Sequence, residues 1–336
     1  MGEPTVLVLS DLLDATADAV IAELELRGVP VFCANPGDFP QTVTLAARLD
    51  GDGMTGTVRV RDRRHQRWRS LALGEVGCGY YRRPTAFRVP DGVPELWQFW
   101  AAREARHGFG GVISALPRWL NHPADIAYAE YKPVQLHYAA QAGLRIPRTI
   151  VTNDPKEARE FGGQVGQVVH KRLSGAVGPG DPFTHLVEPG DLDVADTAHL
   201  FQEWIDKDHE VRVTIVDDAV FAVRIDAHTD AAFVDWRADH DRLTYSVADV
   251  PPAVEVAMHV LMWRLRLRFT AFDFAVTPTG DWVFLEINPN GQWLWLQQHT
   301  GLPIAAAVAT ALQDAAGAAS RPTVPPTEII DHEDRT

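Results

Sequence analysis

Three side chains with oxygen atoms follow one another closely in FLEINPNGQWLWLQQHTGLPI, residues 284–304. Glu286, Asn288 and Asn290 stand at the end of an apolar run, where a strand is expected to stop. Alternate residues of a strand face the same side, so the carboxylate of Glu286 and the amide oxygen of Asn288 project together. Carboxylate and amide oxygens are the ligands that hard cations such as Mg²⁺ prefer.

A second carboxylate reaches the same place if residues 270–288 form a hairpin. Apolar side chains alternate on both arms, and a four-residue turn pairs Phe274 with Leu285. Asp273 then lies directly opposite Glu286. Facing carboxylates repel each other unless a cation lies between them, so these two groups and the neighbouring amide suit Mg²⁺ better than zinc. A solvated acidic sheet face is the alternative.

The stretch EVRVTIVDDAVFAVRID (210–226) predicts a hairpin with a second charged pair. If the valines and isoleucines of both arms face one core, the loop holds three residues and Arg212 lies opposite Arg224. Two guanidinium groups side by side repel each other unless an anion joins them, and phosphate suits their bidentate geometry. Surface arginines paired with nearby carboxylates are the alternative. Together the two hairpins predict a pocket for a nucleotide and a metal ion.

Lysines that neutralise phosphate must come from outside a P-loop, because no GxxxxGK[ST] motif occurs. Lys171 ends a strand just before SGAVGPGD (174–181), where Gly175 and its neighbouring glycines let backbone N–H groups approach phosphate oxygens. Lys132 stands in a mostly apolar helical stretch. A lysine that only extends to solvent is the alternative for Lys132.

The elements that would hold these residues mix strands and helices, which predicts an α/β (α+β) chain. Residues 5–40 predict a β-α-β unit whose helix stops at Gly28, and the missing GxGxxG motif makes this unit a scaffold, not a dinucleotide site. Residues 56–73 alternate as a hairpin, and 94–116 and 123–143 predict helices. At 336 residues, two or three subdomains are expected.

Composition excludes several classes of protein. A formal charge of -14 argues against a general binder of nucleic acid or membrane surfaces. Cys33 and Cys78 form no CxxC pair, so neither a disulfide framework nor a zinc site is predicted, and no histidine motif for a metal occurs. No segment reads as a signal peptide or membrane span, which favours a cytoplasmic protein.

The order of these motifs resembles the ATP-grasp superfamily, and within it the graspetide synthetases, the microviridin-type maturases of ribosomal peptides. The resemblance covers about residues 30 to 310, and its most specific part is the stretch 284–304. The other similar segments are DFP (38–40), YYRRP (80–84), AEYKPVQL (129–136), GLRIPRTIVTNDP (143–155), HKRLSG (170–175), QEWI (202–205), EVRVTIV (210–216) and VDWR (234–237).

The resemblance implies an ATP-grasp fold with an N-terminal β-α-β domain that precedes the ATP-grasp part. The expected divisions are an N-terminal domain at 1–118, a central subdomain at 119–190, a C-terminal subdomain with the metal site at 191–320, and a disordered tail at 321–336.

It also implies roles for individual residues, in three groups. Nucleotide-binding residues would be Lys132, Lys171, Gly175, Gln202, Glu203, Trp204, Ile205 and Glu210. Residues that act on phosphate, acyl phosphate or the acceptor would be Arg212, Arg224, Asp235 and Arg237, and the Mg²⁺ ligands would be Asp273, Glu286 and Asn288. Arg82 and Arg83 would either orient the peptide or form a structural clamp before Pro84.

The implied reaction uses ATP and Mg²⁺ to phosphorylate an Asp or Glu side chain of a precursor peptide that has leader and core segments. A Thr or Ser hydroxyl, or a Lys amine, of the same peptide then displaces phosphate and closes a ring. Two alternatives stay open: a ligase of free amino acids or small peptides, and a non-catalytic peptide- or nucleotide-binding module. The oligomeric state also stays open, with a homodimer among the possibilities.

Overall fold

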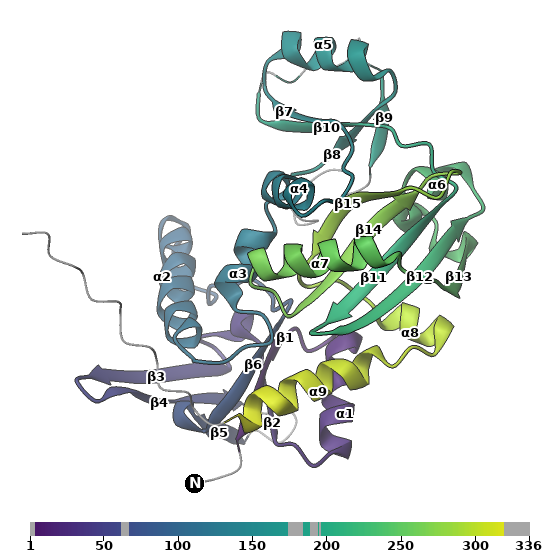
Figure 1. Ribbon diagram of the computed structural model, residues 1–336. Helices are drawn as coiled ribbons and strands as arrows, with labels where there is room; N and C mark the ends of the chain where they lie inside the picture. Colours follow the sequence, from purple (N-terminus) through teal and green to yellow (C-terminus); the bar gives the residue numbers. More distant parts are fainter. Residues whose placement is uncertain (1–3, 62–66, 174–183, 189–193, 195, 319–336) are drawn as a thin grey trace, which may run out of the picture.

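The computed structural model describes residues 4–61, 67–173, 184–188, 194 and 196–318 (Figure 1). The strands are β1 (Thr5–Ser10), β2 (Val31–Ala34), β3 (Val43–Asp50), β4 (Gly53–Arg61), β5 (Trp68–Ala72), β6 (Val76–Arg82), β7 (Thr149–Thr152), β8 (Val168–Lys171), β9 (His185–Val187), β10 (His199–Glu203), β11 (His209–Val216), β12 (Ala219–Ala227), β13 (Leu243–Val247), β14 (Phe269–Val276) and β15 (Trp282–Asn288). The α-helices are α1 (Ala15–Leu26), α2 (Glu95–Ser114), α3 (Pro123–Ala129), α4 (Lys132–Gln141), α5 (Pro155–Val165), α6 (Asp230–Val234), α7 (Pro252–Arg264), α8 (Leu294–Thr300) and α9 (Ile304–Gly317).

The N-terminal part contains the predicted β-α-β unit. β1 lies between β2 and β6 in a parallel sheet, and α1 joins β1 to β2. Asp14 caps α1 by accepting hydrogen bonds from the backbone N–H groups of Thr16 and Ala17. Gly28 follows the helix with φ 71°, a conformation that glycine adopts without steric cost. The prediction for this segment is confirmed, and β4 and β5 form the hairpin expected nearby.

A second antiparallel sheet forms the middle of the chain, in the order β7-β10-β8-β9. Helix α5 covers it, and its small core includes Ala158, Val168 and Phe201. β10 lies beyond residue 190, so this sheet extends past the boundary expected for the central subdomain. The division into domains stays a prediction.

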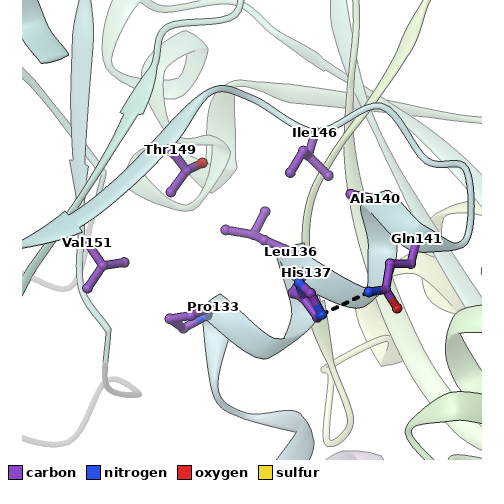
Figure 2. Close-up of a pocket in the computed structure, with 8 residues that line it drawn as sticks. All are labelled: Pro133, Leu136, His137, Ala140, Gln141, Ile146, Thr149 and Val151. Atoms are coloured by element: carbon purple, nitrogen blue, oxygen red, sulfur yellow. Dashed lines mark hydrogen bonds between the residues drawn. The ribbon is translucent and has the colours of Figure 1, made fainter.

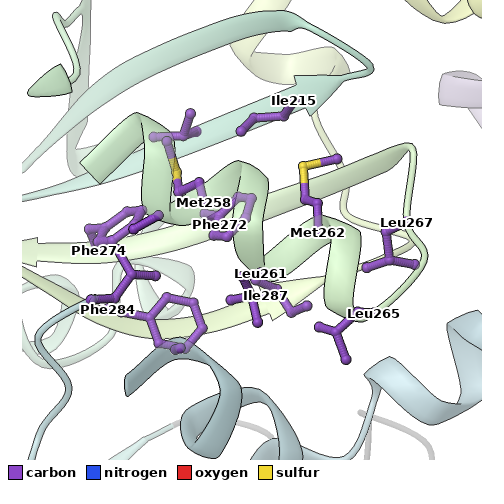
Figure 3. Close-up of a cluster of buried hydrophobic side chains, with 14 of the residues drawn as sticks. Ile215, Met258, Leu261, Met262, Leu265, Leu267, Phe272, Phe274, Phe284 and Ile287 are labelled. Carbon is purple, nitrogen blue, oxygen red and sulfur yellow. The ribbon is translucent and has the colours of Figure 1, made fainter. Parts of the chain in front are cut away.

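The largest sheet has the order β13-β12-β11-β14-β15 and is antiparallel throughout. Helix α7 covers one face, where Met258 and Leu261 pack against Phe272 and Phe274 (Figure 3). The other face carries a second core that includes Val223 and apolar residues of α9 and of the N-terminal sheet. Apolar side chains therefore point from both faces of this sheet.

The double burial explains why one register prediction is wrong. In the β11–β12 hairpin, Arg212 pairs with Val223 and Arg224 pairs with Val211, because the turn holds only Asp217 and Asp218. The prediction of a three-residue loop assumed that the apolar residues of both arms face one core. They face two cores, so the two arginines lie on opposite faces of the sheet.

The β14–β15 hairpin confirms the more important pairing. Asp273 lies opposite Glu286, as predicted. Phe274, however, pairs with Phe284 and not with Leu285, because the register shifts between Asp273 and Phe274. This bulge adds one residue to β15 and compensates for a turn that is one residue longer than expected.

No helix in the described ranges is long and apolar enough to cross a membrane. The predicted tail at 321–336 and the glycine-rich loop with Gly175 lie outside the described residues.

Candidate active site

The facing carboxylates Asp273 and Glu286 lie in the wall of a large cavity. Its volume is about 2010 Å³, and it is lined by residues of the N-terminal part, the central sheet and the five-stranded sheet. Asp273 is buried, with 7% of its surface exposed, and the bulge beside it brings Leu285 as well as Glu286 to the cavity wall. Bulges commonly redirect side chains at active sites, and this one keeps both carboxylates on the cavity side.

Positive side chains surround the two carboxylates. Lys132, the first residue of α4, forms an ion pair with Glu286. Arg212 Nε lies 3.6 Å from Asp273 Oδ1, and in the described chain neither buried atom has a hydrogen-bond partner. The repulsion that the sequence argument assigned to a metal ion is thus already reduced by a lysine and an arginine. Buried polar atoms without partners point to a ligand that would satisfy them.

The two facing carboxyl groups ionise differently. Burial raises the pKa of Asp273 to about 6, while Arg212 opposes this shift and Glu286 adds to it. Burial also disfavours the ionised form of Glu286, but Lys132, Lys171 and other cations outweigh it and hold its pKa at about 2. One carboxylate is therefore firmly ionised at neutral pH, and the other is close to its titration range.

Lys171 ends β8 and lines the cavity. Burial lowers its pKa to about 8, and the neighbouring Lys132 adds to that shift, whereas Glu286 and Glu210 oppose it. A phosphate group beside Lys171 would favour its charged form. The two lysines predicted from the sequence are thus brought together at one end of the cavity.

Asn288 continues from Glu286 along the same wall of the cavity. Its Oδ1 accepts a hydrogen bond from the backbone N–H of Asn290, at 3.0 Å. The two carboxylates and this amide oxygen match the donor set of a hard cation, and the unpartnered Asp273 Oδ1 leaves one donor atom available. In the described chain, no group of three or more His, Cys, Asp or Glu side chains could hold a metal ion. Among the described residues, the candidate set Asp273, Glu286 and Asn288 therefore includes an amide.

Arg82 fixes the loop that follows Asn288, and its side chain is fully buried. It donates hydrogen bonds to the carbonyl oxygen of Asn290 and, at 2.6 Å, to Gln292 Oε1. Asp14 balances the charge of Arg82, with its Oδ2 3.3 Å from Arg82 Nε. Thr16 Oγ1 also donates a hydrogen bond to Gln292 Oε1, at 2.6 Å. Of the two roles expected for this arginine, the structure shows the clamp.

The strand β10 and the segment after it form another wall. Gln202, Glu203, Trp204, Ile205 and Glu210 all line the cavity, as the resemblance implied. The carboxylate of Glu203 accepts hydrogen bonds from the backbone N–H of Arg148 at 3.0 Å and from its Nε at 2.6 Å, so this side chain has a structural partner. The backbone N–H groups of Glu203 and Trp204 also have partners, the carbonyl oxygens of Arg148 and Gln167, each at 2.9 Å.

Sequence reasoning missed Lys207. This residue is buried, lines the cavity and forms an ion pair with Glu210. Its ammonium group lies 5.3 Å from the ring centroid of Trp204 and 5.5 Å from that of Phe233. Its place two residues after QEWI was the only signal, and a lone lysine before a strand carries no recognisable motif.

Asp235 and Arg237 lie together at the cavity, in the segment after α6. The guanidinium of Arg237 donates to both carboxylate oxygens of Asp235, at 2.8 and 2.6 Å. Asp235 Oδ2 also accepts a hydrogen bond from the backbone N–H of Thr184, at 2.9 Å. Burial alone would raise the pKa of Asp235, but Arg237 outweighs it and lowers that pKa. The pair is preorganised, with the guanidinium 41% exposed toward the cavity.

Arg224 does not join the site. Because it lies on the face opposite Arg212, it is absent from the residues of the described chain that line the cavity, and it forms ion pairs with Asp226 and Asp208 instead. Its predicted role in holding phosphate is wrong, and the local carboxylate pairing given as the alternative is what the structure shows.

A second, smaller groove lies between α4 and β7 (Figure 2). Its volume is about 520 Å³, and its walls include Leu136, Ile146 and Val151. His137, which bonds to Gln141 at 2.9 Å, is the only titratable side chain among the described residues that line it. Without a cluster of charged groups, this groove is not suited to phosphate chemistry.

The fold is that of an ATP-grasp ligase, and its charged cavity carries a carboxylate pair on β14 and β15. Among the solved structures that resemble it are two macrocyclases and a RiPP-associated ATP-grasp ligase. Macrocyclase MdnC from Microcystis aeruginosa MRC, bound with precursor peptide MdnA, is 29% identical over 92% of this chain and 98% of its own, with a TM-score of 0.80. Macrocyclase MdnB from the same source is 28% identical over 93% and 99%, with a TM-score of 0.78.

The third is the RiPP-associated ATP-grasp ligase of Chryseobacterium gregarium, solved with ADP and a leader and core peptide. It is 25% identical over 92% of this chain and 95% of its own, with a TM-score of 0.80. No family model and no curated protein matches the sequence. The top structural neighbours of the chain are therefore RiPP-associated ATP-grasp macrocyclases and ligases, as the resemblance predicted.

Proposed function

We propose that the chain is an ATP-dependent macrocyclase that joins side chains within a ribosomal precursor peptide. The observation that carries the proposal is the pair Asp273 and Glu286, held among Lys132, Lys171 and Arg212 in a cavity open to a second substrate. The similarity to MdnC and MdnB, over nearly the whole chain, supports the same substrate class.

In the first step, a carboxylate oxygen of an Asp or Glu side chain in the peptide attacks the γ-phosphorus of ATP, and ADP leaves. Lys132 and Lys171 would bind the phosphates and oppose their charge. Arg212 would hold the transferred phosphoryl group, because its guanidinium is buried beside Asp273 and has an Nε without a hydrogen-bond partner in the described chain. Preorganised donors of this kind favour the charge that develops during transfer.

In the second step, a Thr or Ser hydroxyl, or a Lys amine, attacks the acyl carbon and phosphate leaves. Each ring thus forms with the net loss of one water from the peptide, while ATP becomes ADP and phosphate. The preorganised pair Asp235 and Arg237 would orient the acceptor or the acyl phosphate.

We propose Asp273, Glu286 and Asn288 as the ligands of Mg²⁺, which would neutralise phosphate charge when bound. We also propose that the enzyme works in the cytoplasm, where the free thiols of Cys33 and Cys78 would stay reduced. For the domains, we propose the divisions 1–118, 119–190 and 191–320.

Coexpression with a precursor tests the proposal. We expect a small reading frame beside the gene, rich in Thr and in Asp or Glu, to encode this peptide. We expect mass spectrometry to show the loss of one water per ring, with equal release of ADP, and no loss with Asp273→Asn. An unmodified peptide together with ligation of free amino acids would favour a small-substrate ligase. Peptide binding without ATP consumption would favour a binding module.

A further inference from the structure

The cavity is larger than a nucleotide and a metal ion require. Small-molecule sites commonly measure roughly 300–1,000 Å³, whereas this cavity measures about 2010 Å³. Its lining runs from Glu286 to Arg83 after β6, and on to Phe99, Arg103 and Arg106 of α2. Space for a second substrate therefore lies along α2.

Helix α2 is anchored at only one end. Phe109 and Ile113, in its last turns, are buried. In its first turns, Trp97, Phe99 and Trp100 are 53%, 73% and 56% exposed, and Figure 1 shows the helix at the margin of the molecule. Adjacent exposed aromatic side chains on a soluble protein mark a surface that binds a partner.

Three arginines of this wall have no carboxylate partner. Phe99, Arg103 and Arg106 follow at helical spacing and share the cavity side of α2, and Arg103 lies 5.6 Å from the ring centroid of Phe99. Arg83 has φ 46°, a conformation uncommon for a residue with a Cβ. Within the described ranges, the side chains of Arg83, Arg103 and Arg106 make no ion pair or hydrogen bond. The chain as a whole has a net charge of -14, so this wall, with three unpaired arginine side chains, is locally positive.

We propose that Arg83, Arg103 and Arg106, with Phe99, form a docking wall for an acidic segment of the peptide substrate. The inference rests on the proposed function and names how that site recognises its substrate. Guanidinium groups bind carboxylates through paired hydrogen bonds, and the Phe99 ring offers apolar contact to the intervening side chains. Because the wall and Asp273 belong to one cavity, a peptide held there by its unreacted carboxylates would present another carboxylate to Arg212.

Direct binding tests the wall without requiring turnover. The probe is a short fluorescein-labelled peptide rich in glutamate, and its control is the same peptide with glutamine at each glutamate. We expect the double variant Arg103→Gln, Arg106→Gln to raise the Kd of the glutamate peptide roughly fivefold to twentyfold at low salt, since each exposed ion pair contributes modestly. Glutamine retains good helix propensity, so α2 should persist. Arg159→Gln, at an exposed position of α5 outside the cavity, is the matched control and should leave the Kd unchanged.

The same variants separate the wall from the catalytic site. The double variant should keep wild-type affinity for Mg·ADP, and added salt should weaken peptide binding to the wild type. Equal affinity of wild type and double variant for the glutamate peptide, or equal affinity of wild type for the glutamate and glutamine peptides, would overturn the docking wall. If wild type closes no ring in its true precursor yet binds the glutamate peptide through these arginines, the proposed function fails while the wall stands.

Discussion

Replacing each of the two facing carboxylates by its amide should change the stability of the metal-free protein in opposite directions. Asp273→Asn removes a group whose pKa is raised from 3.8 to about 6, and Glu286→Gln removes one whose pKa is lowered from 4.5 to about 2. At about 1.4 kcal/mol per pKa unit, ionised Asp273 costs about 3 kcal/mol at pH 7. Glu286 contributes about 2 kcal/mol, because a fifth of its side chain is exposed and water screens its ion pairs.

The signs follow from proton binding. Folded Asp273 binds its proton more tightly than the unfolded chain does, so its contribution is favourable below pH 4 and is lost as the pH rises to about 6. Folded Glu286 binds its proton more weakly, so its contribution is present above pH 4.5 and is lost as the pH falls toward 2. At pH 7, the free energy of unfolding should therefore rise with Asp273→Asn and fall with Glu286→Gln. At pH 4, the gain from Asp273→Asn should largely disappear.

Urea unfolding in the presence of a chelator, followed by tryptophan fluorescence, measures both effects. Both variants should lose Mg²⁺-dependent ADP formation, which links the stability measurement to the site. A fall in stability for both variants at pH 7, or a gain for Asp273→Asn that is the same at pH 4 and pH 7, would refute the arrangement of charges described above.

Three further predictions concern the arginines and Lys171. Arg212→Ala should slow phosphoryl transfer on the order of a hundredfold, while Arg224→Ala, on the opposite face of the same hairpin, should keep the wild-type rate in a single-turnover assay; similar rates for both would remove Arg212 from the site. Burial lowers the pKa of Lys171 to about 8, so the affinity for Mg·ADP should weaken as the pH rises above 8. Calorimetry should show no such pH dependence for Lys171→Met. A wild-type affinity that stays constant to pH 9 would contradict a role of Lys171 in binding phosphate. Arg82→Lys keeps the charge but loses the planar fork that donates to Asn290 and Gln292 at the same time. This variant should raise several-fold the Mg²⁺ concentration needed for tight ADP binding. An unchanged Mg²⁺ requirement would show that Asn288 keeps its position without Arg82.

The pairing of Asp273 with Glu286 could be predicted because alternation within one hairpin is a local property. The prediction tolerated an error in the turn, since a bulge compensates for the extra turn residue before the carboxylates are reached. The same reasoning failed for Arg212 and Arg224. A sheet buried on both faces shows apolar residues at consecutive positions, so alternation no longer tells which face an arginine occupies.

Other parts of the site depend on contacts between distant segments, which no local pattern reveals. Lys207 is buried against the ring of Phe233 and near the carbonyl oxygen of Val234, which follow it by more than twenty residues in the chain. The hydrogen-bond acceptors of Arg82, in Asn290 and Gln292, are more than two hundred residues away in the chain. The similarity to peptide ligases suggested roles for Lys132 and Glu286 separately, but not the ion pair between them.

The buried contacts of Arg82 also bear on how this enzyme can be divided or recombined. The guanidinium of Arg82, the last residue of β6, holds Asn290 and Gln292, so the N-terminal unit supports the loop that follows Asn288. A fragment that begins after this unit would lack that support even if its own sheets folded. A chimera that takes its N-terminal unit from another ligase should therefore also take the loop 288–292 from that ligase. The two segments lie far apart in the chain, but they have to match each other because they are in contact.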